Sequence, residues 1–142
     1  MQEINIYTDG GSRGNPGPAA IGIWVESLNK KYSQTIGVAT NNDAEYQALI
    51  FALKKVKLLV GKQKAKSTKL NCFLDSELIV KQLNHEYKIN AENTQRYFIE
   101  VWNLILDFGD ITFTHIRREK NKVADSLVNK ALDEESDQAA LF

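Results

Sequence analysis

A short stretch near the N-terminus decides the fold, and it reads Ile4-Asn5-Ile6-Tyr7-Thr8-Asp9-Gly10-Gly11. Apolar and polar residues alternate along its first part, which is typical of a strand with one buried face. We expect this strand to end at the Asp9-Gly10-Gly11 break, before the turn-forming residues 12–18. Two further strands are predicted at about 20–26 and 32–38, and the polar turn between them makes the three strands an antiparallel meander.

The spacing of apolar residues becomes helical after this meander. Apolar residues recur at three- and four-residue intervals from about Asp43, and the helix that they predict stops at Gly61. The same reasoning predicts the remaining elements: a buried strand over 70–74, a short helix over 79–83, a helix over 97–108 closed by Gly109, a strand over 111–115 and a last helix over 121–132. The order is therefore βββαβααβα, an α/β fold with a five-stranded mixed sheet flanked by helices.

Length and composition describe one ordinary domain. The 142 residues can bury a sizeable core, and we expect a body of residues 1–132 followed by a frayed acidic C-terminal tail at 133–142. Cys72 is the only cysteine, so no intramolecular disulfide can form, which favours a reducing, cytoplasmic setting. We expect neither a signal peptide nor a membrane span, because no apolar run approaches the ~20 residues that a span needs. No obligate protein partner is evident from the sequence.

Four acidic residues are expected to meet at one edge of the predicted sheet. Asp9 closes the first strand and Asp75 the fourth, so their carboxylates would lie side by side if these strands are parallel neighbours. Glu45 shares the helix face that points into the core, where an unpaired charge is costly. Asp125 lies near the start of the last helix. Taken singly, each acid also fits ordinary turn or helix-start chemistry.

Together, the four carboxylates point to a metal site. Like charges brought this close would repel one another without cations. A ligand set made only of oxygen suits Mg²⁺ or Mn²⁺ rather than Zn²⁺. Two such ions about 3.5–4 Å apart are used for in-line cleavage of phosphodiesters, one activating water and the other stabilising the leaving oxygen.

Four stretches of the chain resemble the type 1 ribonuclease H family, and they occur in the family's order. They are Tyr7-Thr8-Asp9-Gly10-Gly11-Ser12-Arg13-Gly14-Asn15-Pro16-Gly17, Thr40-Asn41-Asn42-Asp43-Ala44-Glu45-Tyr46, Asp75-Ser76 and His115-Ile116-Arg117-Arg118-Glu119-Lys120-Asn121-Lys122-Val123-Ala124-Asp125. The resemblance covers about residues 3–132. It implies a ribonuclease H-like fold and an endoribonuclease that hydrolyses the RNA strand of RNA–DNA hybrids, leaving 5′-phosphate and 3′-hydroxyl ends.

The resemblance also implies a role for each matching residue. The metal ligands would be Asp9, Glu45, Asp75 and Asp125, holding two Mg²⁺ that Mn²⁺ could replace, with Asp9 shared by both ions. His115 would assist catalysis, with Arg118 as its rival; an ordinary strand-end histidine is the alternative for His115. The implied hybrid contacts are Gly10, Gly11, Ser12, Arg13, Asn15, Thr40, Asn41 and Asn42. The glycines could equally form a plain tight turn, and Asn41-Asn42 could cap the following helix.

Two segments bear on how tightly a hybrid would bind. The lysine-rich run 54–69 holds seven lysines and no acid, but it leads into a strand whose start lies roughly 20 Å from Asp75. A solvated loop is therefore favoured there over a nucleic-acid patch. Segment 76–110 is mainly acidic and lacks the basic protrusion of family members with high affinity. Its apolar spacing predicts three aromatic residues in the core, namely Tyr87, Tyr97 and Trp102.

The zero net charge, from 18 basic and 18 acidic residues, hides an uneven distribution. Residues 133–137 hold four acids and no base, so the body up to Leu132 keeps the 18 basic residues against 14 acids. Divalent ions at the carboxylates would make this body more basic. We therefore expect binding of a hybrid to depend on metal and to weaken with salt.

Two alternatives to a hybrid-cutting enzyme stay open at this point. One is a ribonuclease H-like nucleic-acid-binding module that has lost catalysis, although such a module would have no chemical reason to keep four mutually repelling acids. The other is a metal nuclease that prefers double-stranded RNA, because groups that recognise a 2′-hydroxyl would serve either duplex.

Overall fold

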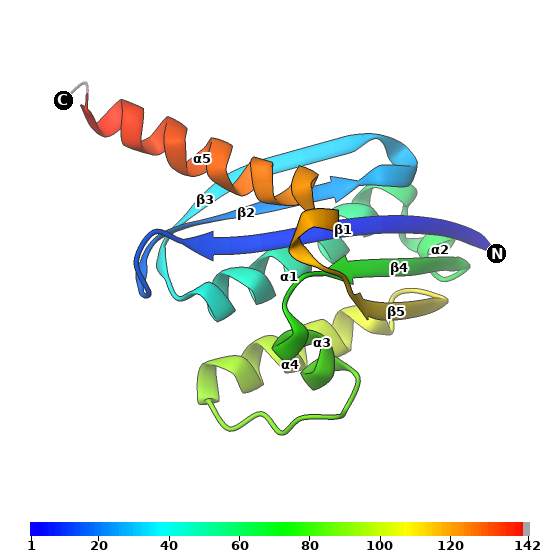
Figure 1. Ribbon diagram of the computed structural model, residues 1–142. Coiled ribbons are helices and arrows are strands. Elements are labelled where there is room, and N and C mark those ends of the chain that lie inside the picture. Colours follow the sequence, from blue (N-terminus) through cyan, green and yellow to red (C-terminus); the bar gives the residue numbers. More distant parts are fainter. Residues whose placement is uncertain (141–142) are drawn as a thin grey trace.

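A five-stranded mixed sheet forms the centre of the computed structural model, which describes residues 1–140 (Figure 1). The strands are β1 (Gln2–Ser12), β2 (Gly17–Val25), β3 (Lys30–Ala39), β4 (Thr68–Leu74) and β5 (Asp110–His115). They lie in the order β3-β2-β1-β4-β5. β1 pairs antiparallel with β2 and parallel with β4, which in turn pairs parallel with β5. The predicted meander and the parallel pairing of the first and fourth strands are both confirmed.

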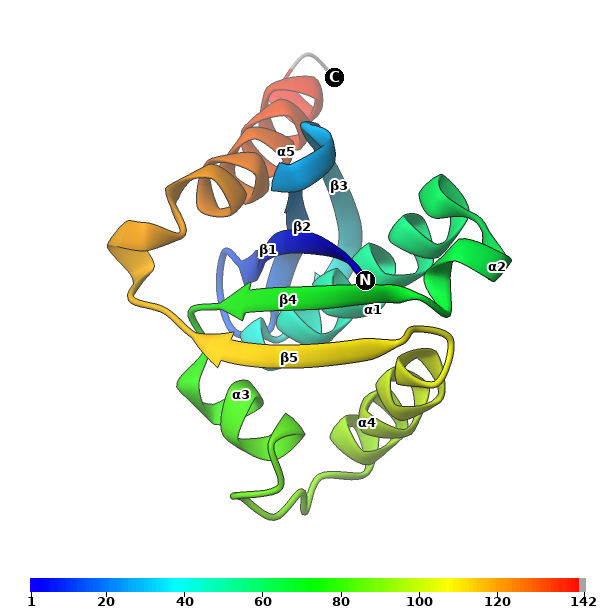
Figure 2. The same ribbon diagram turned by 90° about the vertical axis from the view of Figure 1, so that its right-hand side faces the viewer.

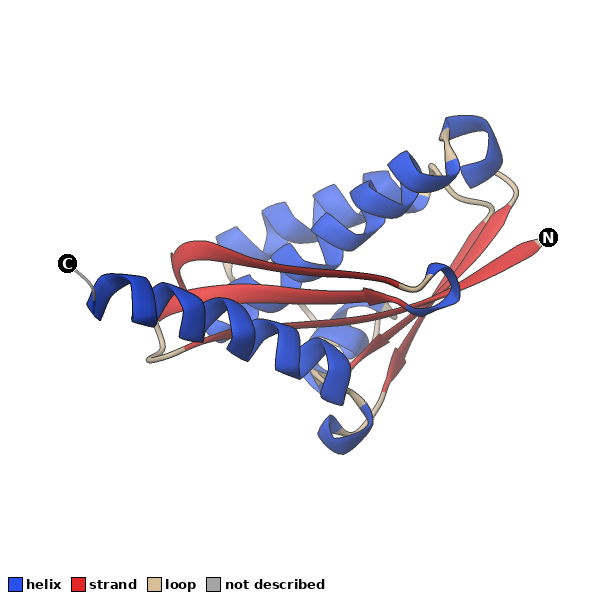
Figure 3. Ribbon diagram, turned by 90° about the horizontal axis from the view of Figure 1, so that it is seen from above, coloured by secondary structure: helices blue, strands red, loops and turns tan. Residues whose placement is uncertain are grey.

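Helices cover the two faces of this sheet. The main ones are α1 (Asn41–Val60), α3 (Glu77–Leu83), α4 (Glu92–Ile105) and α5 (Lys122–Ala140), with short turns at α2 (Lys62–Ala65), η1 (Glu26–Leu28) and η2 (Arg118–Lys120). α1 lies against one face, with α3 and α4 on the same side (Figure 2). α5 crosses the opposite face (Figure 3). The predicted α/β order is confirmed, with α2 as an element that the sequence reasoning did not predict.

Two glycines set the distance between the sheet and the helices that carry acids. A Cβ added at Gly10 of β1 would lie 2.3 Å from the carbonyl oxygen of Ala44 in α1. A Cβ added at Gly22 of β2 would lie 2.3 Å from the carbonyl oxygen of Ala124 in α5. Both helices therefore pack backbone against backbone at these points, which only glycine allows.

The ends of several elements differ from the predicted ones. β1 continues through Asp9 to Ser12, because its antiparallel pairing with β2 continues after its parallel pairing with β4 ends at Thr8. Asp9 thus lies where β4 separates from β1, not at the end of a strand. α1 begins at Asn41, since the Oγ1 of Thr40 accepts a hydrogen bond from the amide of Asp43 at 3.1 Å. α4 ends at Ile105, short of Gly109.

The predicted frayed tail is wrong for the residues that the structure describes. α5 continues past Leu132 to Ala140, so the acids of this segment are part of a helix. Arg13 donates to the carboxylate of Asp133 at 2.5 Å, which ties the extended helix to the loop after β1. The rest of the predicted tail, residues 141–142, lies outside the described residues.

The lysine-rich run is mostly helical, which corrects the predicted loop. It comprises the end of α1 and the whole of α2, and it leads into the start of β4, which is the end of that strand remote from Asp75 (Figure 1). Among residues 1–140, no helix is long and apolar enough to cross a membrane.

Two of the three aromatic residues of segment 76–110 differ from expectation, whereas Tyr97 packs against the core as predicted. Tyr87 is 48% exposed and Trp102 is 52% exposed, so neither belongs to the core. Tyr97 is half-buried and stacks on Tyr46, with ring centroids 5.9 Å apart. Apolar spacing predicted the helix that carries Tyr97 and Trp102 but not which of its faces meets the core, and Tyr87 lies in the segment between α3 and α4.

A candidate metal centre where two parallel strands separate

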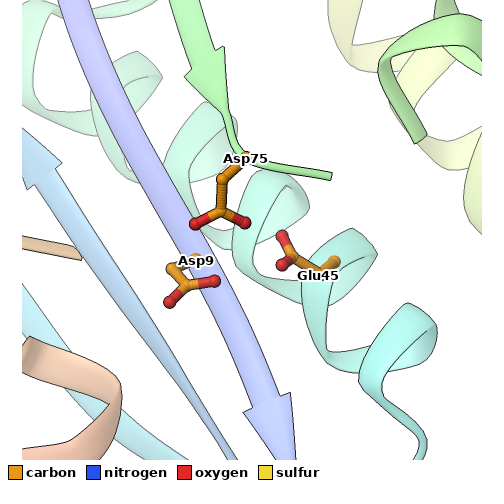
Figure 4. A group of neighbouring side chains, drawn as sticks. All are labelled: Asp9, Glu45 and Asp75. Carbon is orange, nitrogen blue, oxygen red and sulfur yellow. The ribbon is translucent and has the colours of Figure 1, made fainter. Parts of the chain in front are cut away.

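Three carboxylates from three elements meet beside the end of β4 (Figure 4). Asp9 belongs to β1, Glu45 to α1, and Asp75 directly follows β4. One oxygen of each carboxylate lies within 4.8 Å of the other two. Asp9 and Glu45 are each only 7% exposed. The sequence prediction that these residues converge is therefore confirmed for these three acids.

Local sequence explains why each of the three carboxylates faces the others. Alternation along β1 turns Gly10 toward α1 and Asp9 toward the other face. Because β4 stops pairing with β1 at Thr8, the edge of β1 beside Asp9 is open, and acids from both sides of the sheet can meet there. The same close approach places the backbone of Glu45 beside β1, because a Cβ added at Gly10 would lie 2.5 Å from the amide nitrogen of Glu45. Asp75 is held where the chain leaves β4 for α3, because the hydroxyl of Ser76 accepts from the amide of Ile79 at 3.3 Å and caps that helix.

Burial and repulsion make this group of acids costly in its charged form. Burial raises the pKa of Asp9 to about 7, and the nearby carboxylate of Asp75 adds to the shift. Burial also raises the pKa of Glu45 well above its ordinary value, followed by repulsion from Asp9 and Asp75. The Oε2 atom of Glu45 is buried with no hydrogen-bond partner within the described part of the chain. An all-oxygen donor set with an orphaned buried oxygen fits a hard divalent cation.

Asp125 lies on the wall of the same cavity but outside the group of three. It is placed in the first turn of α5, and its carboxylate raises the pKa of Asp9 only as a smaller contribution than burial. Its Oδ1 lies 3.4 Å from a guanidinium nitrogen of Arg118. The nearby Asn129 side chain donates to its Oδ2 at 3.4 Å. The expected convergence of all four acids thus holds as three carboxylates close together and a fourth acid on the wall of the same cavity.

An open cavity of about 400 Å³ gives access to these carboxylates. Five of the eight predicted hybrid contacts line it: Gly10, Gly11, Ser12, Arg13 and Asn41. The other three lie beyond the lining, at Asn15, Thr40 and Asn42.

The rim of the cavity is held together by two asparagine side chains. The amide of Ser12 donates to Oδ1 of Asn41 at 2.9 Å, and the amide of Asn41 donates to Oδ1 of Asn15 at 3.0 Å. These bonds fasten the glycine-rich loop to the start of α1. Asn41 therefore does not cap the helix as considered from the sequence, because Thr40 fills that position.

The structure separates the two residues proposed to assist catalysis. His115 is the last residue of β5, pairs in register with Leu74, and is exposed outside the lining of the cavity. Arg118 lines the cavity beside Asp125. The geometry therefore brings Arg118, and not His115, to the carboxylates.

Asn121 is a residue of the site that sequence reasoning missed. It is only 1% exposed, and its Nδ2 donates to Oδ2 of Asp75 at 3.1 Å. An asparagine just before a helix is normally taken for an N-cap, so its type and position gave no signal of this contact. Its place four residues before Asp125 was the only available hint.

Comparison with known proteins agrees with this geometry. Residues 8–131 match the family described as Reverse transcriptase-like. The crystal structure of LC11-RNase H1 in complex with an RNA/DNA hybrid is 42% identical, with a TM-score of 0.86, over 93% of this chain and 98% of that one. The chain belongs to the type 1 ribonuclease H family.

Other ribonucleases H are similar over nearly the whole chain. The ribonuclease HI of Halobacterium salinarum is 38% identical over 136 residues, which is 92% of this chain and 65% of that protein. Its crystal structure superposes with a TM-score of 0.81. The bifunctional protein Rv2228c of Mycobacterium tuberculosis is 34% identical over 97% of this chain but only 38% of its own length. The chain thus spans about two-thirds or less of these curated relatives.

Proposed function

We propose that this ribonuclease H family member is a metal-dependent endoribonuclease that hydrolyses the RNA strand of RNA–DNA hybrids, leaving 5′-phosphate and 3′-hydroxyl ends. The observation that carries the proposal is the buried group of Asp9, Glu45 and Asp75 at the base of an open cavity. The similarity to LC11-RNase H1, whose structure contains an RNA/DNA hybrid, supports the choice of substrate. We propose a cytoplasmic setting, which the single free thiol of Cys72 supports.

The residues proposed to hold metal are the four acids. Asp9 would be shared by two Mg²⁺, or two Mn²⁺, with Glu45 and Asp75 completing one ligand set and Asp125 the other. The separation of Asp125 from the group of three supports two ligand sets over one. When bound, such a pair of ions activates water and stabilises the leaving oxygen.

Arg118 is the side chain proposed to assist this chemistry. The Arg118 side chain is 81% exposed, so its pairing with Asp125 is a weak surface contact that it can exchange for a phosphate oxygen. Hydrogen bonds from a guanidinium stabilise the negative charge that a cleaved phosphodiester develops. His115 is proposed to contribute less, because it lies outside the cavity.

The cavity rim is proposed to read the hybrid. Backbone amides around Gly11 and Ser12 can approach the sugar edge of the minor groove, where 2′-hydroxyls distinguish RNA from DNA. The three contacts beyond the lining extend this surface along the duplex, with Asn42 exposed and Thr40 half-buried. Arg13 is available to a phosphate once it leaves its exposed ion pair with Asp133.

A panel of labelled duplexes tests the proposal. Hybrid, double-stranded RNA and double-stranded DNA are each incubated with Mg²⁺, Mn²⁺ or EDTA, using the parent and Glu45→Gln. Asp43→Asn is the matched control, because this acid lies on the same helix but outside the cavity. We expect the parent and Asp43→Asn to cut only the RNA strand of the hybrid, and only with metal. We expect Glu45→Gln, which lacks one of the proposed metal ligands, to lose this cutting. Preferential cutting of double-stranded RNA would favour the alternative nuclease, and no cutting with either metal would favour a binding module.

A further inference from the structure

We propose that Asn121 is a positioning residue that fixes the carboxylate of Asp75 and the start of α5 for metal binding. This inference rests on the proposed function of the carboxylate site. Asn121 is an uncharged residue, and its side chain is buried between the sheet and the first turn of α5.

The side-chain nitrogen of Asn121 has two acceptors at the point where β1 and β4 separate. Nδ2 donates to the carbonyl oxygen of Thr8 at 2.8 Å and to Oδ2 of Asp75 at 3.1 Å. Thr8 and Leu74 form the last pair in the parallel ladder between β1 and β4, and Asp9 and Asp75 come next. Asn121 therefore bridges the two strands at the point where they separate and their acids begin.

The orientation of the Asn121 side chain is fixed by these two partners. Both are acceptors, so only the amide nitrogen can face them, and Oδ1 must point the other way. This oxygen is buried with no partner among residues 1–140. An asparagine before a helix normally uses that oxygen to cap the helix, and a buried oxygen left unpaired lowers stability. The side chain thus serves the sheet and Asp75 instead of the cap.

The backbone of Asn121 extends the bridge to the fourth acid. The amide of Asp125 donates to the carbonyl oxygen of Asn121 at 3.0 Å, which sets the first turn of α5. The amide of Asn121 itself donates to the carbonyl oxygen of Arg118 at 2.9 Å. One residue is therefore bonded to the segments that carry Asp75, Asp125 and Arg118, and to the residue that precedes Asp9.

A hydrogen bond to one oxygen of a metal-binding carboxylate restricts its rotation. Groups that hold metal ligands in this way commonly change metal affinity or activity by about 10- to 100-fold when removed. Without Asn121, the carboxylate of Asp75 would have to be ordered by the cation itself. The inferred role is therefore preorganisation of the ligand set rather than direct contact with substrate.

Calorimetric titration with Mn²⁺, in the absence of nucleic acid, tests this role. The variants are Asn121→Ala and Asn121→Leu, and the second has a side chain with the same number and branching of heavy atoms, slightly larger in volume, but no donor. Asn71→Ala is the matched control, because the amide of Asn71 also bridges two side chains, those of Asn5 and Glu3, at 3.0 and 3.3 Å. We expect Mn²⁺ affinity to fall about 10- to 100-fold in both Asn121 variants and to stay unchanged in the control. Hybrid cleavage should recover at saturating Mn²⁺.

An unchanged Mn²⁺ affinity in folded Asn121→Leu would overturn the inference, because a space-filling role predicts that result. Should both variants fail to fold, NMR of the parent protein decides. We expect the side-chain amide signal of Asn121 to exchange slowly with solvent and to shift when Mg²⁺ is added; an unshifted signal would overturn the inference. A parent that binds Mn²⁺ but cuts no hybrid would refute the proposed function and leave the role of Asn121 standing.

Discussion

At the scale of single residues, burial and repulsion make the carboxylates costly in their charged form, and a bound divalent cation would lower that cost. Asp9 has a pKa raised from 3.8 to about 7, mainly by burial and then by Asp75. Between these pH values the folded protein keeps a proton that the unfolded chain has released. Protonation of Asp9 therefore favours the folded state, and this contribution to the free energy of unfolding is complete below about pH 4 and is lost as the pH rises through about 7.

The pH dependence of metal-free stability follows from this. In EDTA, the free energy of unfolding of the parent should fall between pH 5 and pH 8 more steeply than that of Asp9→Asn. At pH 8, Asp9→Asn should be more stable than the parent by about 1–3 kcal/mol, because it removes a buried charge. Denaturant titrations at the two pH values measure both quantities. A parent as stable as the variant at pH 8 would contradict the assigned electrostatics.

Arg118 and His115 should separate in activity because only Arg118 lines the cavity. We expect Arg118→Ala to lower kcat on a hybrid by about 100-fold, as removal of a donor to developing charge does. His115→Ala should lower kcat by less than about threefold, and by much less than Asp75→Asn. Steady-state kinetics at saturating Mg²⁺ measures kcat for each variant. A larger loss of kcat in His115→Ala than in Arg118→Ala would show that His115, and not Arg118, assists catalysis.

At the scale of elements, glycines control where the acids lie. A Cβ at Gly10 would displace α1, and Glu45 moves with that helix. We expect Gly10→Ala to cost about 3 kcal/mol of stability and to weaken Mn²⁺ binding. Gly11→Ala is the control for stability, because the nearest atom to its added Cβ is 3.7 Å away. Thermal unfolding and metal titration give the comparison, and a fully stable Gly10→Ala would show that α1 can shift without penalty.

The sequence predicted most of the sheet and three of the four acid positions, for identifiable reasons. Strand alternation and the following turn residues located Asp9 and Asp75, and helical spacing placed Glu45 on the inner face. The exact end of β1 could not be predicted, because Asp9 continues to pair with β2 after β4 has left. The separate position of Asp125 and the bridge made by Asn121 depend on how α5 docks across the sheet, which no local pattern encodes.

The same limit explains the errors in α4 and α5. Val101 and Leu104 of α4 are buried while Trp102 is exposed, although all three belong to one apolar-rich pattern. An acid-rich segment after Leu132 was predicted to fray, yet it continues as a helix whose Asp133 pairs with Arg13. Both outcomes depend on contacts between segments far apart in the chain.

At the scale of the whole molecule, we expect the acids at 133–137 of α5 to weaken the binding of a negatively charged duplex. Neutralising the acidic residues of 133–137 to their amides should tighten hybrid binding a few-fold at low salt, because Arg13 is freed and the net charge rises. The gain should vanish at high salt. Fluorescence anisotropy with labelled hybrid, in an inactive Asp9→Asn background, measures both conditions. Equal affinity of the two proteins at low salt would show that this end of α5 does not face the duplex.

We propose that Asp9 and its neighbouring carboxylates hold the metal that cuts RNA in a hybrid. The most direct test of this proposal is end-mapping of the products from a doubly labelled hybrid, treated with the parent or with Asp9→Asn in Mg²⁺. We predict that the parent cuts only the RNA strand and leaves 5′-phosphate and 3′-hydroxyl ends, while Asp9→Asn is inactive. An Asp9→Asn protein as active as the parent, or cutting that persists in EDTA, would contradict the account.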